Sequence, residues 1–280
     1  MEKVMVVGAG TMGFGIAQTF LQSGYQVILY DIDTPKVDKG ISNIESNIQK
    51  MLQKGDISAD QYEEIRARLK GTIELADAKD VDLVVETVIE NSDIKKDIFK
   101  KLDRICQPDT ILATNTSSIV ISSIAAATKR PENVIGMHFF NPPPMMPLIE
   151  IVIGMKTSEK TLATMKAIVQ SLGKESVTVK DSPGFVFNRI MIPMINEATY
   201  LLSESVASAE DIDKTLKLAA THQIGPLALG DFIGLDVCLH VMEVLHKEIG
   251  EDKYRPSPLL KRMVAANQLG RKTGEGFFKY

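Results

Sequence analysis

The regular alternation of two patterns over roughly the first 180 residues constrains the fold most strongly. Short runs of β-branched and apolar residues alternate with longer stretches of helical periodicity. Several short runs are apolar at every position, which is typical of strands buried on both faces of a parallel sheet. The alternation therefore predicts a doubly wound α/β fold with a mostly parallel sheet. The predicted strands are Lys3–Val7, Gln26–Tyr30, Val81–Val85, Thr110–Thr114, Val134–His138, Leu148–Ile153 and, more weakly, Ser176–Val179.

Helical periodicity fills the intervals between these strands. A charged stretch, Ala59–Lys70, is also helical in pattern, and the turn residues Lys54-Gly55-Asp56 precede it. With the helix before it, this stretch predicts a helical hairpin inserted between the second and third predicted strands. The other expected helices are Phe14–Ser23, Lys36–Gln53, Ser92–Ile105 and Glu159–Ser171.

The pattern changes at Pro183-Gly184, after which only helical periodicity is visible to about residue 268. A chain of 280 residues is long enough for two domains of about 150 residues each. We therefore expect an α/β domain over residues 1–183 and a smaller all-α domain over residues 184–280. Within the second, Phe185–Ile195 is apolar nearly all round, with Pro193 expected to kink it. Such a helix is buried in its domain or against another subunit, which favours a homodimer or a higher homo-oligomer.

Composition excludes several classes of protein. The 32 basic residues are outnumbered by 36 acidic ones, which disfavours a general nucleic-acid binder. We expect neither a signal peptide nor a membrane span, because no apolar run approaches about 18 residues. Cys106 and Cys238 cannot build a disulfide framework, and no Cys/His cluster has the spacing of a metal site. These features predict a cytoplasmic protein without metal, membrane or nucleic-acid partners.

The segment GAGTMG at residues 8–13 directly follows the first predicted strand and opens a helix. In this strand–turn–helix context, the glycine spacing predicts a Rossmann-type dinucleotide site. Gly8 permits the tight turn, Gly10 lets a pyrophosphate approach the backbone, and Gly13 allows close helix–strand packing. The helix N-terminus at Thr11 and Met12 supplies backbone N–H groups to phosphate.

Asp31 ends the second predicted strand, 23 residues after Gly8. A carboxylate at this point accepts hydrogen bonds from the adenosine ribose and repels a 2′-phosphate. Ile32-Asp33 follows without an arginine that could bind such a phosphate. The sequence therefore favours NAD as the cofactor, and NADP remains possible.

Of the four histidines, only His138 ends a predicted strand, at the edge where α/β sheets bind ligands. His240 and His246 lie in a helical stretch and His222 precedes a Gly-Pro turn, so structural or solvated roles are expected for them. Taken alone, His138 is equally compatible with a catalytic role and with that of a satisfied core histidine.

Glu150 interrupts the apolar run Leu148–Ile153, where a buried carboxylate would require a partner. A return between two strands could bring it to His138, where it would fix the tautomer of the imidazole and raise its basicity. Such a pair fits an alcohol oxidation, in which a base removes the hydroxyl proton as hydride leaves carbon. The alternative is an exposed position of Glu150 on an edge strand.

Two other polar positions stand out. Asn115 to Ser118 follow a predicted strand, and their side chains either face a ligand or cap the next helix. Asn188 lies within the apolar helix and either joins helices or faces a cleft.

The chain resembles the short-chain 3-hydroxyacyl-CoA dehydrogenases over essentially its whole length, in particular the bacterial 3-hydroxybutyryl-CoA dehydrogenases. Seven motifs in the family's order are more specific than any one alone. They are GAGTMG at 8–13, VVETVIE at 84–90, TNTSS at 114–118, GMHFFNP at 136–142, DSPGFVFNR at 181–189, GPLALGDFIGLD at 225–236 and GRKTGEGFFKY at 270–280.

This resemblance implies reversible NAD(P)-dependent oxidation of (S)-3-hydroxybutyryl-CoA and reduction of acetoacetyl-CoA. It implies that His138 is the general acid/base with Glu150 as its partner, and that Ser117 and Asn188 position the substrate. An acyl-CoA is then the small-molecule partner. The cofactor contacts implied by the family are Gly8, Gly10, Thr11, Met12, Gly13, Asp31, Glu90, Lys95, Asn115, Asn141 and Lys272. Lys50 and Lys54 are candidates for the coenzyme A tail or are simply solvated.

Two alternatives stay open at this point. A dehydrogenase of free 3-hydroxy acids would normally use a lysine in its helical domain. A non-catalytic dinucleotide-binding protein, such as a redox sensor or a crystallin-like relative, would not need Ser117, His138, Glu150 and Asn188 together.

Overall fold

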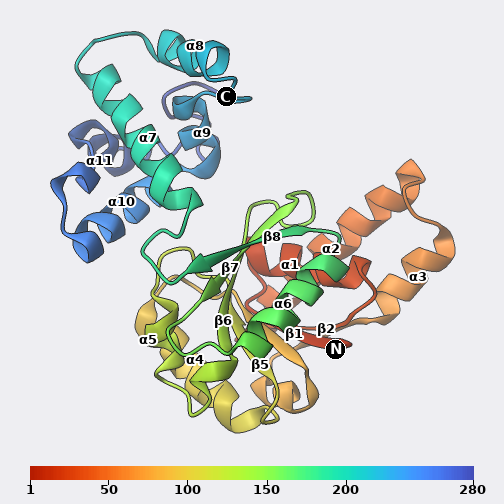
Figure 1. The fold of residues 1–280 in the computed structure, drawn as a ribbon. Coiled ribbons are helices and arrows are strands. Elements are labelled where there is room, and N and C mark those ends of the chain that lie inside the picture. The colour runs from red at the N-terminus through yellow and green to blue at the C-terminus, as the bar shows by residue number, and fades with distance from the viewer. The chain divides into compact units, whose positions relative to one another are not determined.

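An eight-stranded sheet organises the first of two units in the computed structural model, which describes the whole chain from residue 1 to 280 (Figure 1). The chain divides into Met1–Asp181 and Ser182–Tyr280, two residues before the boundary expected from the sequence. None of the helices combines the length and the apolar character that crossing a membrane requires.

The sheet has the strand order β3-β2-β1-β4-β5-β6-β7-β8. All neighbouring strands are parallel except β6 and β7, which run antiparallel. The predicted doubly wound, mostly parallel sheet is therefore confirmed. The strands are β1 Lys3–Val7, β2 Gln26–Tyr30, β3 Leu69–Thr72, β4 Leu83–Glu86, β5 Ile111–Thr114, β6 Val134–Phe139, β7 Leu148–Ile153 and β8 Glu175–Lys180.

Helices cover the sheet so that its apolar strands are buried on both faces. Side chains of α1, α2 and α6 share one core with alternate strand residues such as Val6. The intervening strand residues, Met5 and Val84 among them, are also fully buried. The helical elements are α1 Thr11–Gln22, α2 Thr34–Lys54, α3 Ala59–Ala67, η1 Leu75–Asp80, α4 Ser92–Ile105, α5 Ile121–Ala125, η2 Pro131–Asn133 and α6 Glu159–Ser171.

The helical hairpin forms from α2 and α3, but one expectation about its end is wrong. The helix expected to reach Lys70 stops at Ala67, and Leu69–Thr72 forms β3, the edge strand beside β2. Gly71 and Thr72 are poor helix formers, and a Cβ at Gly71 would lie 2.6 Å from side chains of α2. A four-residue edge strand with a single large apolar residue leaves little periodicity to detect.

The second unit contains only helices, as predicted. Its long apolar helix begins at Phe187 rather than Phe185, because Gly184 and Phe185 adopt positive φ, and it continues past Ile195 to Ser203. Ile190 on this helix is 62% exposed, so the helix is not buried all round within a single chain. The helices are α7 Phe187–Ser203, α8 Ala209–Ala219, α9 Pro226–Ile233, α10 Leu235–Ile249, η3 Asp252–Tyr254 and α11 Pro258–Ala265.

The last eleven residues fold around Asp231, a fully buried carboxylate of α9. Its oxygens accept hydrogen bonds from the backbone N–H groups of Phe277 and Phe278 and from the Tyr280 hydroxyl. A Cβ at Gly276 would lie 2.0 Å from Asp231 Oδ1, so the approach requires glycine. The C-terminal segment is thus part of the second unit's structure.

Candidate active site

The loop between β1 and α1 has the shape that its glycine spacing predicts. Gly8 has φ +106°, and a Cβ there would lie 2.7 Å from Thr87 Oγ1. A Cβ at Gly13 would lie 1.8 Å from the Gly8 carbonyl oxygen. The Thr87 hydroxyl donates to the carbonyls of Val7 and Gly8, so packing fixes this turn.

Gly10 differs from these two glycines. A Cβ at Gly10 would meet no protein atom within 4 Å, and the residue is exposed. Gly10 is the N-cap of α1, and no side chain caps the helix there. The backbone N–H groups that begin at Thr11 and Met12 therefore border open space that a Cβ would narrow. A helix N-terminus of this kind suits the pyrophosphate of a dinucleotide, so the residues present fit NAD.

Asp31 follows β2 and is held beside this loop. Its Oδ2 accepts from the Ala9 N–H at 2.8 Å and its Oδ1 from the Ile32 N–H at 2.7 Å. One cation that the sequence reasoning did not consider lies nearby. The Lys36 ammonium is 2.8 Å from Asp33 and 4.0 Å from Asp31. The position of Lys36 in the sequence does not show whether its ammonium reaches Asp31 or Asp33.

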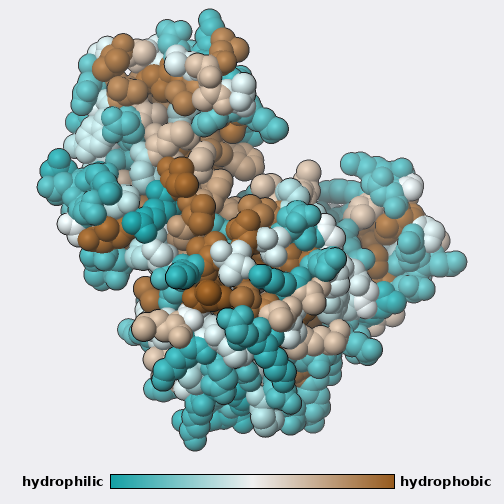
Figure 2. Space-filling model, in the orientation of Figure 1, coloured by the Kyte–Doolittle hydropathy of each residue, from teal (hydrophilic) through white to brown (hydrophobic).

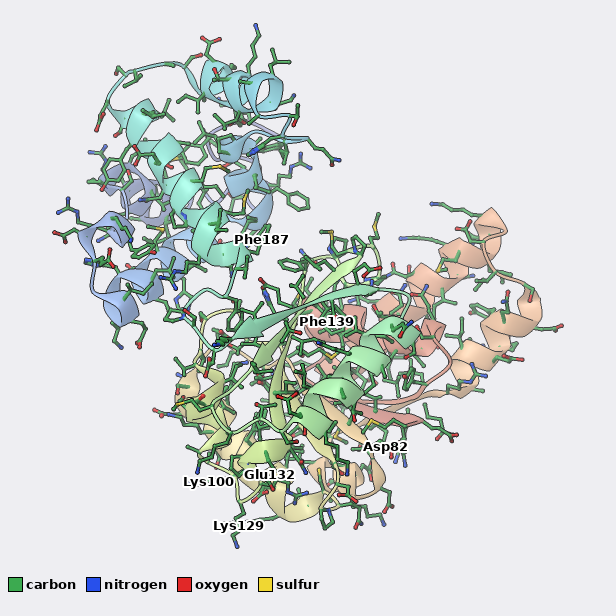
Figure 3. The ribbon with its side chains drawn as sticks, viewed as in Figure 1. Asp82, Lys100, Lys129, Glu132, Phe139 and Phe187 are labelled. Atoms are coloured by element: carbon green, nitrogen blue, oxygen red, sulfur yellow. The ribbon has the colours of Figure 1, made fainter.

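His138 and Glu150 are directly opposite each other in the antiparallel pair β6–β7 (Figure 3 labels the adjacent Phe139). His138 Nδ1 lies 2.7 Å from Glu150 Oε2, and the residues are 6% and 1% exposed. Because β7 lies between β6 and β8, the alternative of an edge position for Glu150 is excluded. An ionised carboxylate only accepts hydrogen bonds, so with Glu150 ionised this contact places a proton on Nδ1 of His138.

The loop after β5 is organised by Glu90. Its Oε1 accepts from the backbone N–H groups of Ser117 at 3.3 Å and Ser118 at 3.2 Å, and from the hydroxyls of Thr116 and Ser118. These hydroxyls do not cap the next helix, because the N–H groups of Ile121 and Ser122 at the start of α5 donate to Asp181. The loop is thus fixed around Ser117 by a carboxylate from the loop between β4 and α4.

Lys95 joins this carboxylate to a second one. Its ammonium lies 2.7 Å from Glu86 Oε1 and 3.3 Å from Glu90 Oε2, and the residue is only 1% exposed. Burial by itself raises the pKa of Glu90, but Lys95 and the hydroxyls of Thr116 and Ser118 outweigh it, and the pKa lies below its ordinary value. Glu86 was missed by sequence reasoning, although a carboxylate that ends the apolar run LVVE is a detectable signal.

The two asparagines expected near the cofactor both lie in loops after strands. Asn115 follows β5, and its Oδ1 accepts from the Phe139 N–H at 2.9 Å, which ties the end of β5 to β6. Asn141 is exposed and precedes a cis bond to Pro142. Its loop is anchored on α1, since Pro143 lies against Gly15.

The remaining predicted residues lie elsewhere. Asn188 is the second residue of α7, and Lys272 pairs with Asp236 at 2.8 Å, both in the helical unit. Lys50 and Lys54 lie one turn apart on α2 and are exposed. The structure therefore forms three groups within the sheet unit. The glycine loop lies with Asp31, His138 pairs with Glu150, and the loop of Ser117 is joined to Glu90 and Lys95.

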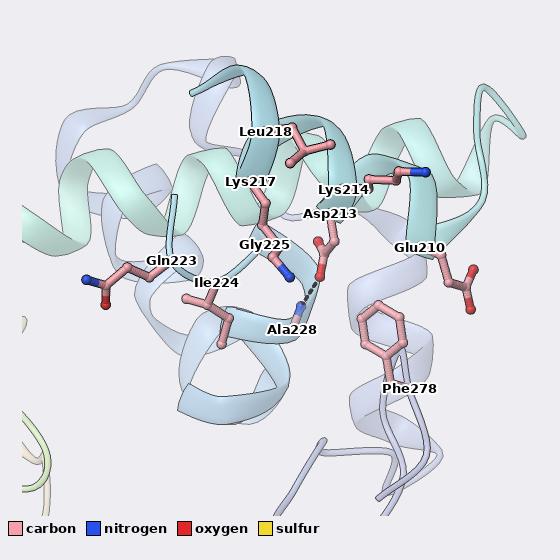
Figure 4. Close-up of a pocket in the computed structure, with 10 residues that line it drawn as sticks. All are labelled: Glu210, Asp213, Lys214, Lys217, Leu218, Gln223, Ile224, Gly225, Ala228 and Phe278. Atoms are coloured by element: carbon pink, nitrogen blue, oxygen red, sulfur yellow. Dashed lines mark hydrogen bonds between the residues drawn. The ribbon is translucent and has the colours of Figure 1, made fainter. Parts of the chain in front are cut away.

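The helical unit has a pocket of about 480 Å³ of its own (Figure 4). Lys214, Lys217, Leu218 and Phe278 contribute to its lining, but none of the predicted site residues does. The Asp213 carboxylate beside it accepts from backbone N–H groups at the start of α9. This pocket is thus separate from the predicted chemistry.

Comparison with known proteins gives consistent matches over both units. Residues 3–182 match the family description "3-hydroxyacyl-CoA dehydrogenase, NAD binding domain", and residues 184–280 match "3-hydroxyacyl-CoA dehydrogenase, C-terminal domain". The chain is 51% identical to 3-hydroxybutyryl-CoA dehydrogenase of Clostridioides difficile over 99% of both chains. It is 40% identical to the mitochondrial hydroxyacyl-coenzyme A dehydrogenase of Homo sapiens, over 100% of this chain and 91% of that one.

A solved structure with a similar fold is that of (S)-3-hydroxybutyryl-CoA dehydrogenase from Ralstonia eutropha. Its TM-score is 0.96 at 48% identity, and the match covers 100% of this chain and 99% of that one.

Proposed function

The chain belongs to the 3-hydroxyacyl-CoA dehydrogenase family, an oxidoreductase family with an NAD-binding domain, and from this membership we propose its substrate and mechanism. We propose that it interconverts (S)-3-hydroxybutyryl-CoA and acetoacetyl-CoA reversibly with NAD. The relatives named for this reaction, at about half identity over the full chain, support the substrate. The observation that carries the mechanism is the buried pair of His138 and Glu150.

Bound NAD would supply the hydride acceptor for carbon 3 of the hydroxyacyl group, and NADH the hydride donor for the reverse reaction, with the backbone from Gly10 to Gly13 and Asp31 holding the cofactor. In oxidation, His138 Nε2 removes the hydroxyl proton, and in reduction it donates that proton to the forming alcohol. Glu150 holds the imidazole in one orientation and stabilises the imidazolium form. Acid–base catalysis by a positioned histidine contributes about 100- to 10,000-fold in rate.

Ser117 and Asn188 position the substrate in this proposal. A hydroxyl or an amide N–H that donates to an oxygen stabilises it as negative charge develops there. Glu90 accepts the N–H groups of Ser117 and Ser118, so the backbone that carries this hydroxyl is held before substrate arrives. Asn188 belongs to the helical unit, which we propose contributes to the substrate site.

The cofactor contacts follow from the glycine loop. We propose that the backbone from Gly10 to Gly13 binds the pyrophosphate and that Asp31 accepts from the adenosine ribose hydroxyls. Asp31 repels a 2′-phosphate, so NAD is preferred to NADP. Asn115, Asn141 and Lys272 are proposed contacts along the rest of the cofactor, whereas Lys95 acts through its carboxylate partners because its ammonium is buried. Exposed Lys50 and Lys54 are proposed to meet the coenzyme A phosphates.

Apolar side chains on the surface of the helical unit support a homo-oligomer (Figure 2). Ile190, Val206 and Leu218 are 62%, 63% and 72% exposed, and they come from α7, the segment after it, and α8. Burial against a second copy would remove such surface from water. We propose that the helical unit carries this interface. We also propose a cytoplasmic location, since both cysteines are free, buried thiols.

The test is steady-state kinetics of the variant His138→Gln with acetoacetyl-CoA and NADH. We expect kcat to fall about 100-fold or more, while the NADH dissociation constant measured by fluorescence stays within twofold. Glu150→Gln should lower kcat less severely, because the imidazole remains. His246→Gln, a substitution of a partly exposed histidine on α10, is the matched control. Near-normal reduction by His138→Gln would refute the proposed base.

The same assay separates the alternatives for the substrate. Free acetoacetate should be reduced far more slowly than acetoacetyl-CoA. A comparable rate would instead indicate a dehydrogenase of free 3-hydroxy acids, and no turnover of either would indicate a dinucleotide-binding protein without catalysis.

A further inference from the structure

Glu86, the last residue of β4, is a buried carboxylate to which the proposed mechanism gives no role. It is 0% exposed. Oε1 accepts from the Lys95 ammonium at 2.7 Å and from the Val88 N–H at 2.7 Å. Oε2 accepts from the Thr114 hydroxyl at 2.7 Å. Three donors from three segments therefore hold one side chain in a single orientation.

Two routes lead from this carboxylate to the loop that contains Ser117. The first runs through Lys95 to Glu90, whose Oε1 accepts the N–H groups of Ser117 and Ser118. The second runs through the Thr114 hydroxyl, which accepts the Thr116 N–H at 3.2 Å. The first route thus ends on the N–H groups of Ser117 and Ser118, and the second on the N–H group of Thr116.

The charges indicate what the loss of the Glu86 charge would do to this arrangement. With both carboxylates ionised, two negative charges share one ammonium inside the sheet unit. A buried ion pair is costly to desolvate and is worth keeping only if its geometry is well satisfied. If Glu86 becomes neutral, Lys95 has Glu90 as its only charged partner. The ammonium would then draw the Glu90 carboxylate away from the loop N–H groups.

We propose that Glu86 is a positioning residue of the reaction, which holds the Ser117 loop in its catalytic position through Lys95 and through Thr114. The proposal rests on the proposed function, because it assumes that Ser117 acts on the substrate oxygen. It gives Glu86 a part in turnover without direct contact with substrate or cofactor.

The variant Glu86→Gln keeps the shape of the side chain and removes its charge. We expect kcat for acetoacetyl-CoA reduction to fall about tenfold. This is less than the roughly 100- to 1,000-fold that removal of a transition-state hydrogen-bond donor costs, because Glu86→Gln displaces the Ser117 hydroxyl without removing it. The NADH dissociation constant should stay within twofold, since none of the hydrogen bonds to the Glu86 side chain comes from the glycine loop. An unchanged kcat would overturn the proposal.

A double-mutant cycle with Ser117→Ala separates positioning from a merely structural role. If Glu86 acts through Ser117, then Glu86→Gln should change kcat less than twofold in the Ser117→Ala background. Multiplying effects in the double variant would show that Glu86 does not work through this loop and would refute the proposal. If Ser117→Ala alone leaves kcat unchanged, the proposed role of Ser117 is the part that fails.

Thr114→Val tests the second route and is the recourse if Glu86→Gln does not fold. It removes the hydroxyl between Glu86 and Thr116 while conserving volume, and it should lower kcat and show the same coupling to Ser117→Ala. Thr110→Val is the matched control. This buried hydroxyl lies just before β5, at the end of the strand opposite to Thr114, and donates to the Val81 carbonyl. It should lower the thermal midpoint to a similar extent and leave kcat unchanged. Equal kcat losses in the two threonine variants would contradict the proposal.

Discussion

At the scale of single residues, the Glu90 carboxyl links the Ser117 loop to pH. Burial raises the pKa of Glu90, but Lys95 and two hydroxyls lower it by a larger amount. The pKa therefore lies below its ordinary value of 4.5. A depressed pKa contributes stability that is complete above the unfolded-state pKa and is lost as pH falls through the folded-state value. We therefore expect the stability difference between the wild type and Glu90→Gln to be largest at neutral pH. It should shrink below about pH 4.5.

Urea unfolding of both proteins across this pH range measures that difference. Glu63→Gln, at a side chain that is 69% exposed on α3, is the surface control. A difference that grows on acidification would have the wrong sign for a carboxylate stabilised by Lys95.

The two thiols give a second prediction at this scale. Burial raises the pKa of Cys106 to about 11 and that of Cys238 to about 12, and both residues are buried. Since only the thiolate reacts, about one Cys106 thiol in a thousand is in the reactive form at pH 8 while the residue stays buried. A disulfide reagent should therefore modify neither thiol in the native protein and both after unfolding in urea. Rapid modification of the native protein would show that one of these sites opens.

Sequence reasoning found some of these residues and not others, for physical reasons. His138 and Glu150 were accessible because a carboxylate inside an apolar run needs a partner, and antiparallel pairing puts the two residues opposite each other. Glu86 ends an apolar run, which is a signal for a buried carboxylate, but the run alone does not show that its partners are Lys95 and Thr114. Lys95 lies on a strongly amphipathic helix, and periodicity does not show that its ammonium turns inward to two carboxylates.

At the scale of elements, the β1–loop–α1 segment separates glycines needed by the fold from the one available to a ligand. A Cβ at Gly13 would lie 1.8 Å from the Gly8 carbonyl, whereas a Cβ at Gly10 meets nothing. Gly13→Ala must displace α1 from β1 and should lower the free energy of unfolding by about 1–3 kcal/mol or more. Gly10→Ala should cost at most about 1 kcal/mol, because alanine is only a poor N-cap.

Relative to the stability that each variant loses, Gly10→Ala should weaken NADH binding more than Gly13→Ala does. Gly10→Ala should raise the NADH dissociation constant about tenfold or more, a loss of about 1.4 kcal/mol, because its methyl group enters the space left for pyrophosphate. Calorimetric titration and urea unfolding of both variants check this. Unchanged NADH affinity in Gly10→Ala would place the pyrophosphate elsewhere.

The elements that could be predicted are those with repeated signals. Continuous apolar runs predicted the strands β1, β5, β6 and β7. Helical periodicity predicted α4 and α6 with the bounds that the structure shows. The edge strand β3 had neither signal, because its four residues LKGT include a single large apolar side chain. Its parallel pairing with β2 is a tertiary interaction that local pattern does not contain.

At the scale of the whole molecule, the proposed site residues are distributed over two units, each of which has its own apolar core. The glycine loop, Asp31, the Ser117 loop and the His138–Glu150 pair all lie in Met1–Asp181. Asn188 and Lys272 lie in the helical unit, which has a separate apolar core around α7, α10 and α11. The sequence shows this division because strand and helix patterns alternate before Pro183-Gly184, whereas only helical periodicity follows it.

The division predicts that residues 1–181 alone fold and bind NADH but do not turn over acetoacetyl-CoA. The fragment keeps its complete sheet and every residue that we propose to hold the pyrophosphate and adenosine ribose, so its NADH dissociation constant should lie within about tenfold of the full chain, about 1.4 kcal/mol. It lacks Asn188, so turnover should be lost. The fragment with Gly10→Ala is the control for specific binding. A fragment that folds, as its circular dichroism would show, yet does not bind NADH would mean that the helical unit supplies an essential part of the cofactor site, with Lys272 the first residue to examine.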